Sequence, residues 1–353
     1  ERAMLLLFLA CRAALAAGLG VKIGFDADAH LFVLERISWN SINLPLLQSL
    51  YSYHPPLGFL LPRIPLALGA SPVLALEIVP WIASLIAFFA VRRTLALLGI
   101  LHRPEGIVLL YAAFSVPMIV FLARSVNLDS LIFAEAAVAL LCSVRALWRD
   151  DESPARAAAI WGLFLTLALG MLTKYSGLLL FAIPALVALA SPMRRRAVTL
   201  GVYVCLTALL VVFPYYYFRY YTQTRDWMPS TSDRVFDAPQ QMHARRTRDN
   251  DRLAFLIRLF SPKPDNLSPE QRDLGTPRLA DTWKDLWSRA VWLGPSSRWT
   301  TIVGRMLSAL MAWLLPIGLL LGSARLRGAG EWARLGRVLY PLGALLCVAS
   351  VAY

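Results

Sequence analysis

Cysteine is scarce in this sequence, and its few copies lie inside long apolar runs. The four cysteines among 353 residues are Cys11, Cys142, Cys205 and Cys347. Because none lies in a polar stretch, the sequence excludes a disulfide framework and a cysteine-ligated metal site. The thiols are expected to be small apolar filler between helices, so they do not indicate the redox compartment.

Charged residues are also few. They make up 16% of the chain, whereas hydrophobic residues make up 58% and the mean hydropathy is +0.57. An average soluble domain has about 25% charged residues and does not need apolar residues in blocks of bilayer length. The composition excludes an ordinary soluble domain and predicts a protein that crosses a membrane several times.

Signatures of several function classes are missing. No cytoplasmic segment carries a Gly-rich phosphate loop, which argues against a nucleotide cofactor on that side. The net charge is +13, yet no nucleic-acid-binding motif accompanies it. Many of the cations lie beside apolar runs, where they meet anionic lipid head groups. We expect membrane lipids as partners and no nucleic acid.

Nine apolar runs approach the length of about 20 residues that a helix needs to cross a bilayer. They are 4–21, 73–91, 106–123, 128–147, 157–172, 175–190, 197–213, 302–321 and 335–352. We predict an all-α polytopic membrane protein with about nine transmembrane helices. A transmembrane bundle (1–217) holds a first outer loop (22–72), followed by an extracytoplasmic region (218–300) and C-terminal helices (301–353). Because the chain ends in or just after a span, we expect this last part to be truncated.

The arginines predict the orientation. With a cytoplasmic N-terminus, the inner connections and adjoining helix ends carry Arg92, Arg93, Arg103, Arg145, Arg149, Arg156, Arg194, Arg195, Arg196, Arg325, Arg327, Arg334 and Arg337. The two short outer turns carry only Arg124 and Lys174. Cations concentrate on the cytoplasmic side, so 22–72 and 218–300 are expected outside.

Two outer segments are apolar without being long enough to cross. The run 57–68 is short and contains Pro62 and Pro65, which predicts an interfacial or re-entrant helix. In 218–300, apolar residues at helical spacing, including Trp283 and Trp287, predict helices along the membrane surface. Anchoring is favoured there over a sugar-stacking platform.

The first outer loop gathers ionisable side chains. Asp26, Asp28 and His30 follow the first span directly. If 26–37 is helical, Asp26 and His30 share a face because they are four residues apart. The alternative is a helix cap by Asp26 or Asp28 with His30 on a wet surface.

Two further ionisable residues lie at the outer ends of later spans. Asp129 begins the fourth span, and Lys174 lies in the tight turn after the fifth. An ionisable group at a membrane helix pairs or faces a wet cavity, although a lysine can also extend its ammonium to the interface. Deeper in their spans, the residues Glu77, Glu135 and Arg12 are expected to form ion pairs inside the bundle.

The order of these features resembles a known superfamily. The segments that carry the likeness are the Asp26–His30 cluster, Tyr53-His54-Pro55-Pro56-Leu57-Gly58, Asn127-Leu128-Asp129-Ser130 and Leu172-Thr173-Lys174-Tyr175-Ser176-Gly177. They resemble the membrane-embedded GT-C glycosyltransferases, and most of all the dolichyl-phosphate-mannose protein mannosyltransferases and the lipid A aminoarabinose transferases. The resemblance covers about residues 1–215.

The resemblance implies inverting transfer of a sugar from a polyprenyl-phosphate-linked donor to an acceptor glycan, lipid or protein on the extracytoplasmic face. Asp26 matches a leading acid that acts as general base, and Lys174 matches a lysine near the donor phosphate. The resemblance also implies a substrate cavity, to which we assign four side chains: His30, His54, Asp129 and Tyr175. It implies that the first outer loop (22–72) is catalytic, and we expect a bacterial inner (plasma) membrane with the active site facing outward. No nucleotide cofactor is implied.

The chain departs from the family pattern at one point. The family often has two adjacent acids, but here Ala27 follows Asp26 and the second acid is Asp28. Either acid could be the base, and a loss of activity is also open. A divalent metal ion is a candidate cofactor, with Asp26, Asp28 and His30 as its candidate ligands.

Two other functions compete with the transferase. A transporter or flippase of a lipid-linked or anionic solute would use Lys174 and Asp129 as pathway charges. Such a protein is expected to have repeated halves, broken helices and charges near the midplane. A non-catalytic relative that only binds the lipid carrier is the third alternative.

The two acids can be told apart by substitution. If Asp26 is the base, Asp26→Asn should abolish sugar transfer and leave lipid-phosphate binding nearly intact, because an amide keeps the shape but cannot take the proton. Turnover assays on both Asn variants decide the assignment. Severe loss in Asp28→Asn with near-normal turnover in Asp26→Asn would reverse it.

Overall fold

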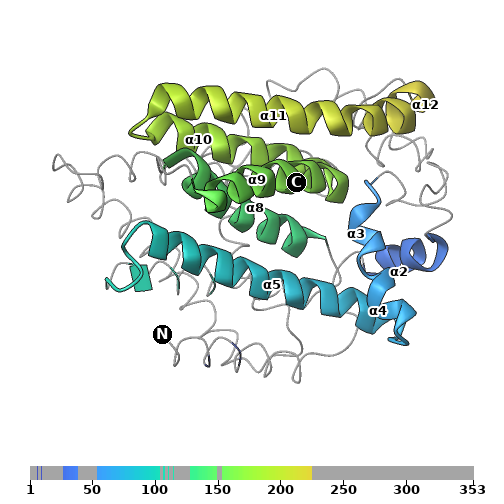
Figure 1. Ribbon diagram of the computed structural model, residues 1–353. Helices are drawn as coiled ribbons and strands as arrows, with labels where there is room; N and C mark the ends of the chain where they lie inside the picture. Colours follow the sequence, from blue (N-terminus) through green and yellow to red (C-terminus); the bar gives the residue numbers. More distant parts are fainter. Residues whose placement is uncertain are drawn as a thin grey trace, which may run out of the picture.

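The computed structural model describes residues 6, 9, 27–38, 54–103, 106–107, 110, 114, 128–148 and 153–224. These residues form helices and short connections, and no strand occurs among them. The all-α prediction is therefore confirmed for this part of the chain. Figure 1 shows the long helices lying side by side as a bundle.

The helices have the following bounds. Three lie in the predicted first outer loop: α2 (Ala27–Arg36), α3 (Leu57–Leu60) and α4 (Arg63–Ala67). The bundle then contains α5 (Pro72–Leu97), α8 (Asp129–Ser143), the π-helical η1 (Val144–Trp148), α9 (Pro154–Thr173), the 3₁₀-helical η2 (Tyr175–Phe181), α10 (Ala182–Ala190), α11 (Arg194–Tyr216), the π-helical η3 (Tyr217–Tyr221) and α12 (Thr222–Thr224).

Four of these helical stretches are long and apolar enough to cross a membrane. They are Pro72–Leu97, Asp129–Trp148, Pro154–Thr173 and Arg194–Tyr221, and they confirm the spans predicted at 73–91, 128–147, 157–172 and 197–213. The predicted span 175–190 is helical and apolar but shorter than these four. The other four predicted spans lie wholly or mostly outside the described residues, so the count of nine stays a prediction.

Serine followed by proline sets the start of two spanning helices. Ser71 caps α5 by accepting a hydrogen bond from the amide of Leu74, and Pro72 takes the first helical position. Ser153 caps α9 by accepting from the amide of Arg156. A serine oxygen satisfies an amide that lacks a partner in the first turn, and proline there loses no hydrogen bond.

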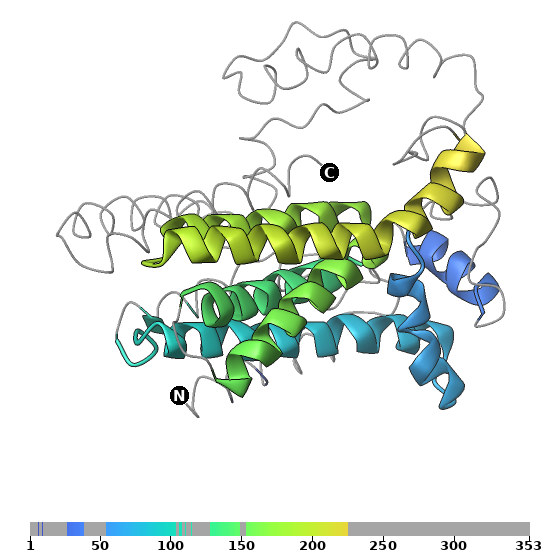
Figure 2. The same ribbon diagram turned by 45° about the horizontal axis from the view of Figure 1, so that its top comes forward.

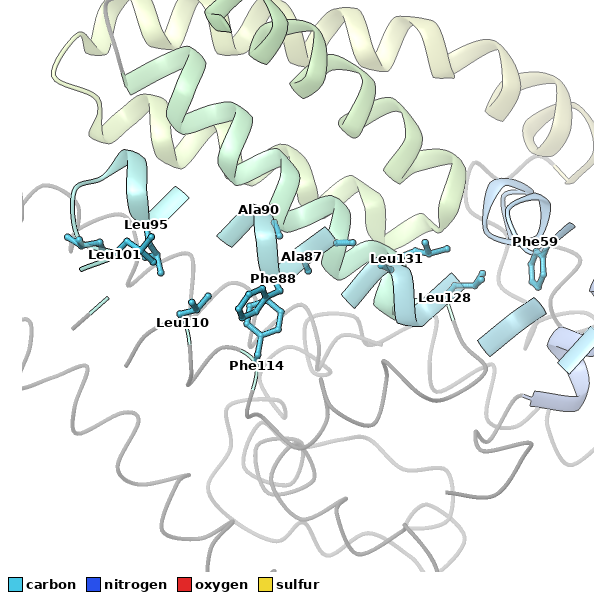
Figure 3. Packing of buried hydrophobic residues seen from close by; sticks show 14 of the residues in the cluster. Phe59, Ala87, Phe88, Ala90, Leu95, Leu101, Leu110, Phe114, Leu128 and Leu131 are labelled. Carbon is cyan, nitrogen blue, oxygen red and sulfur yellow. The ribbon is translucent and has the colours of Figure 1, made fainter. Parts of the chain in front are cut away.

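Small residues let α5 and α8 pack closely. Ala83 and Ala87 of α5 and Ala134 and Ala137 of α8 are all buried in one cluster. Helices inside a membrane associate through such close packing, because lipid tails are as apolar as the side chains. Beside the alanines, Phe88 lies edge-on to Phe114, with ring centroids 5.4 Å apart (Figure 3).

The predicted first outer loop packs against one end of this bundle. Figures 1 and 2 show α2, α3 and α4 gathered near the start of α5, at the end where α12 also lies. Leu34 of α2 is fully buried in a cluster with Ala75 and Leu76 of α5. The run predicted as an interfacial or re-entrant helix consists of α3 and α4, divided before Arg63. Both are too short to cross, and their depth in the membrane stays a prediction.

A pair of glycines joins α9 to η2. The chain leaves α9 at Lys174, whose backbone is extended (φ −159°, ψ 155°), and turns back so that Gly177 meets α9 at Gly170. A Cβ atom on Gly177 would overlap the backbone of Gly170. Backbone cannot move aside as a flexible side chain can, so this turn needs glycine at 177.

Substitution of Gly177 tests this packing. Gly177→Ala should destabilise the protein by about 1 to 3 kcal/mol, the usual cost of inserting a methyl group into packed structure. The control is Gly201→Ala, because a Cβ there would make only ordinary contacts of 3.8 Å and more. The thermal midpoint in detergent should fall in the first variant and not in the second; equal midpoints would contradict the close approach.

Candidate functional site

An ion pair joins α8 and α9 at the end of the bundle that carries the first-loop helices. Lys174 Nζ lies 2.6 Å from Asp129 Oδ1. The lysine side chain is 12% exposed, whereas that of Asp129 is 46% exposed. The ammonium is therefore largely withdrawn from solvent, and its partner carboxylate stays accessible.

The positions of both residues follow from the helices that hold them. Asp129 lies in the first turn of α8, and Lys174 is the residue that caps the C-terminal end of α9. A helix N-terminus favours an anion and a C-terminus favours a cation, by about 0.3 to 1 kcal/mol each at exposed positions. The two helix dipoles thus support the pair that the two side chains form.

A histidine and a tyrosine lie beside this pair. The His54 ring lies 6.1 Å from the Tyr175 ring, centroid to centroid. Burial, then the positive charges of Lys174 and His30, lower the pKa of His54 from its usual 6.5 to about 3. His54 is therefore a neutral imidazole at physiological pH, able to donate one hydrogen bond and accept another.

His30 belongs to the same end of the molecule. It is buried on α2, and its ring lies edge-on to Phe59 of α3 with centroids 5.5 Å apart. Its charge acts on His54, and α3 itself packs against α9. Four of the predicted site residues, His54, Asp129, Lys174 and Tyr175, thus come together directly, and His30 adjoins them through α3.

Asp26 lies outside the described residues, and Asp28 is described only as part of the α2 backbone. Their predicted roles as base or metal ligand therefore stay predictions. In the ranges that the structure describes, no group of three or more His, Cys, Asp or Glu side chains could hold a metal ion.

A cluster of tyrosines packs around the turn that contains Lys174. Tyr175 packs against Tyr216 and Tyr220, with ring centroids 6.1 Å and 5.6 Å apart. Tyr216 also donates a hydrogen bond of 2.7 Å from its hydroxyl to the carbonyl oxygen of Met171, near the end of α9. Such carbonyls lack partners within the helix, so the tyrosine stabilises this helix end.

The sequence analysis missed this cluster. The signal was the run from Tyr215 to Tyr221, which contains five tyrosines besides Phe218 and Arg219, directly after a predicted span. Arg219 is buried there, with its guanidinium carbon 6.0 Å from the Tyr220 ring centroid. Aromatic residues at a span end are typical of a membrane interface, but that pattern does not predict which of them face inward.

The contact of Glu135 differs from the expected ion pair. Its Oε1 accepts a 2.6 Å hydrogen bond from the hydroxyl of Thr173, the last residue of α9. The hydroxyl is a sufficient partner for this oxygen, so no cation is needed there. Glu77 is buried on α5, and Arg12 lies outside the described residues.

Comparison with known families identifies the chain at the level of family. Residues 66–249 match the family described as "Predicted membrane protein (DUF2142)", which is more than half of the chain. The chain belongs to the DUF2142 family. This DUF2142 chain is an integral membrane protein, as its apolar helices also indicate. No curated protein matches it.

Two solved structures resemble the DUF2142 chain. ArnT from Cupriavidus metallidurans in the apo state has a TM-score of 0.50 at 15% sequence identity, over 99% of this chain and 76% of that chain. The same protein bound to undecaprenyl phosphate gives a TM-score of 0.49 and 14% identity over the same shares. ArnT is a lipid A aminoarabinose transferase with the GT-C fold. The apo structure confirms the GT-C resemblance for the fold.

The depressed pKa of His54 predicts a pH dependence of stability. The unfolded chain takes a proton on His54 below about pH 6.5, but the folded protein does so only near pH 3. Stability should therefore fall with decreasing pH in this window, by at most about 1.4 kcal/mol per pH unit from this one group. Thermal midpoints of wild type and His54→Gln measure it, and the variant should lose this component.

His102 provides the control, because it is an exposed histidine beyond the far end of α5. His102→Gln removes an imidazole far from the Lys174 pair, so the pH profile of His54→Gln is compared with that of His102→Gln as well as with wild type. If His54→Gln keeps the wild-type profile, then His54 does not titrate as the structure predicts.

Proposed function

We propose that the protein is a glycosyltransferase that moves a sugar from a polyprenyl-phosphate-linked donor to an acceptor, with inversion. The observation that carries the proposal is the Lys174 ammonium, largely withdrawn from solvent yet bound to a carboxylate that is 46% exposed. A cation in this setting can meet an anionic group that approaches from the accessible side. The GT-C fold supports a transferase over other membrane proteins.

Charge development on the donor explains why the site needs a cation. When the bond between the anomeric carbon and the phosphate oxygen breaks, negative charge gathers on the leaving lipid phosphate. A fixed ammonium stabilises this charge more strongly in a partly dehydrated site than in water. Lys174 is fixed by its place at the end of α9 and by Asp129. Asp129 balances its charge until the phosphate shares the ammonium.

His54 is proposed to orient a substrate by hydrogen bonding. Its pKa of about 3 excludes a second cation beside Lys174 at physiological pH. The same value makes it a weak proton acceptor, because protonation would place a charge on a buried ring and bring two positive charges close together. We therefore assign phosphate binding to Lys174 and a neutral donor or acceptor role to His54.

The general base is proposed to be Asp26 or Asp28, following the family resemblance. Asp26 immediately precedes α2, and Asp28 lies in its first turn. The acceptor hydroxyl would attack the anomeric carbon from the side opposite the phosphate, and its proton would pass to the carboxylate. His30, two residues further along α2, adjoins His54, which supports the approach of this loop to the Lys174 end.

A divalent metal ion held by Asp26, Asp28 and His30 stays a prediction, because the side chains of the two acids lie outside the part of the chain that the structure describes. His30 itself packs edge-on against Phe59. We derive no step through a metal ion.

The Lys174 end is proposed to face the outside of a bacterial plasma membrane. The motivation is the concentration of arginines at the opposite helix ends, including Arg92, Arg93 and Arg194 to Arg196. Nucleotide sugars are absent from that side, so a lipid-linked donor suits it. Protease or thiol-labelling accessibility of a cysteine placed beside Lys174 would test the orientation.

The competing transporter would need its charges near the middle of the membrane. Asp129 and Lys174 instead lie at the ends of α8 and α9. This location favours chemistry at the membrane surface.

Substitution of Lys174 tests the proposal. Lys174→Ala should weaken the binding of undecaprenyl phosphate by about tenfold to a hundredfold, because a hydrogen bond to a charged group contributes about 1.5 to 3 kcal/mol. Lys174→Arg should recover part of the loss, since it keeps the charge in a different shape. Affinity is measured by titration of the purified protein in detergent, at equal folded yield.

The matched control is Arg36→Ala. Arg36 is an exposed cation on α2, at the same end of the bundle, and its guanidinium contacts Phe32 of its own helix. Like Lys174→Ala, the substitution Arg36→Ala removes one positive charge, but it does not touch the ion pair of Lys174 and Asp129. Equal affinity of wild type and Lys174→Ala would remove Lys174 from the site, and an equal loss in both variants would reduce the effect to net charge.

A further inference from the structure

Glu135 is an unusual residue for its position. It lies within the spanning helix α8, where a carboxylate is costly, and its Oε2 is buried without a hydrogen-bond partner. Its Oε1 contacts the hydroxyl of Thr173, which is 0% exposed. A leucine at this position would be cheaper for the bundle. The cost indicates a function for the contact with Thr173.

The space for this carboxylate is made by a glycine. A Cβ atom on Gly170 would lie 3.4 Å from Glu135 Oε2 and would overlap the side chain of Leu180. Because Gly170 has no side chain, Glu135 can reach the last turn of α9. The last turn of α9 therefore contacts both the backbone of Gly177 and the side chain of Glu135.

Thr173 transmits this restraint to its neighbour. It is the last residue of α9, and Lys174 leaves the helix directly after it in an extended conformation. The ends of helices fray unless their groups are held. The Glu135 contact fixes Thr173, and the Tyr216 hydroxyl fixes Met171 two residues earlier. These two contacts therefore set the direction in which the chain leaves α9 at Lys174.

We propose that Glu135 and Thr173 are positioning residues, which hold Lys174 in the geometry that binds the donor phosphate. This inference rests on the proposed function of Lys174 and adds the device that orients it. Neither residue touches the substrate; both act through Lys174. A group held in place before the substrate arrives loses little freedom on binding, which is the physical advantage of the arrangement.

The sign of the effect separates positioning from electrostatics. An ionised Glu135 would repel an anion and a protonated one would not, so if charge alone matters its removal should strengthen the binding of an anion or leave it unchanged. Positioning predicts the opposite. Glu135→Ala should weaken the binding of undecaprenyl phosphate about threefold to tenfold, whereas Glu135→Gln, whose amide oxygen still accepts from Thr173, should stay within about twofold of wild type.

The decisive experiment is a double-substitution cycle on Thr173 and Lys174. Thr173→Val removes the hydroxyl with little change in shape, and Thr173→Ser keeps the hydroxyl. Undecaprenyl phosphate affinity is measured for both, alone and combined with Lys174→Ala, on protein of equal thermal midpoint. We expect about a threefold to tenfold loss in Thr173→Val, near-normal affinity in Thr173→Ser, and no added loss from Thr173→Val once Lys174 is absent.

Each outcome has one meaning. An unchanged affinity in Lys174→Ala overturns the proposed phosphate site itself. If Lys174→Ala weakens binding, the positioning role is overturned by normal affinity in Thr173→Val or by an equal loss on the Lys174→Ala background. If Thr173→Val does not fold, the Glu135 pair decides: unchanged or tighter binding in Glu135→Ala overturns the positioning role, and weaker binding with recovery in Glu135→Gln supports it.

Discussion

The arrangement of the site depends on one constraint: the ammonium of Lys174 is largely withdrawn from solvent and must be neutralised. Lys174 keeps 12% of its side chain exposed, so an unpaired charge there would cost several kcal/mol. Asp129, from a helix that starts where α9 ends, supplies the opposite charge at 2.6 Å. This contact requires α8 and α9 to run in opposite directions with their ends level. The tyrosines and the first-loop helices then pack around the pair.

The side chains of the site fall into two groups, according to whether they are accessible or buried. Groups that touch the accessible side, such as Asp129, can exchange partners with a substrate, whereas buried groups such as Thr173 and Tyr216 hold the backbone. His54 stays neutral first because it is buried, and second because Lys174 and His30 place positive charge near it. A lysine ammonium paired with one accessible carboxylate and adjoined by a neutral imidazole suits the recognition of one phosphate group.

The elements that the sequence predicted well are those with local signals. The spans at 73–91 and 157–172 follow from apolar length, and the Ser-Pro starts of α5 and α9 from capping chemistry. Asp129 and Lys174 stood out because an ionisable group held in a membrane helix pairs or faces a wet cavity, and the short outer turns carry few cations. The contacts of Glu135 with Thr173 and of Tyr216 with Met171 join residues 38 and 45 positions apart, and no local pattern predicts such pairs. The 3₁₀ start of η2 was also missed, because it accompanies the tight return of Gly177 against Gly170.

The most direct test of the account is the position of the lipid phosphate in an experimental structure. The protein would be purified in lipid nanodiscs with undecaprenyl phosphate, and its structure solved by electron cryomicroscopy with and without the lipid. The account predicts phosphate density within hydrogen-bond distance of Lys174 Nζ, on the side where Asp129 is exposed. Phosphate density at the opposite end of the bundle, beside Arg194 to Arg196, would contradict it.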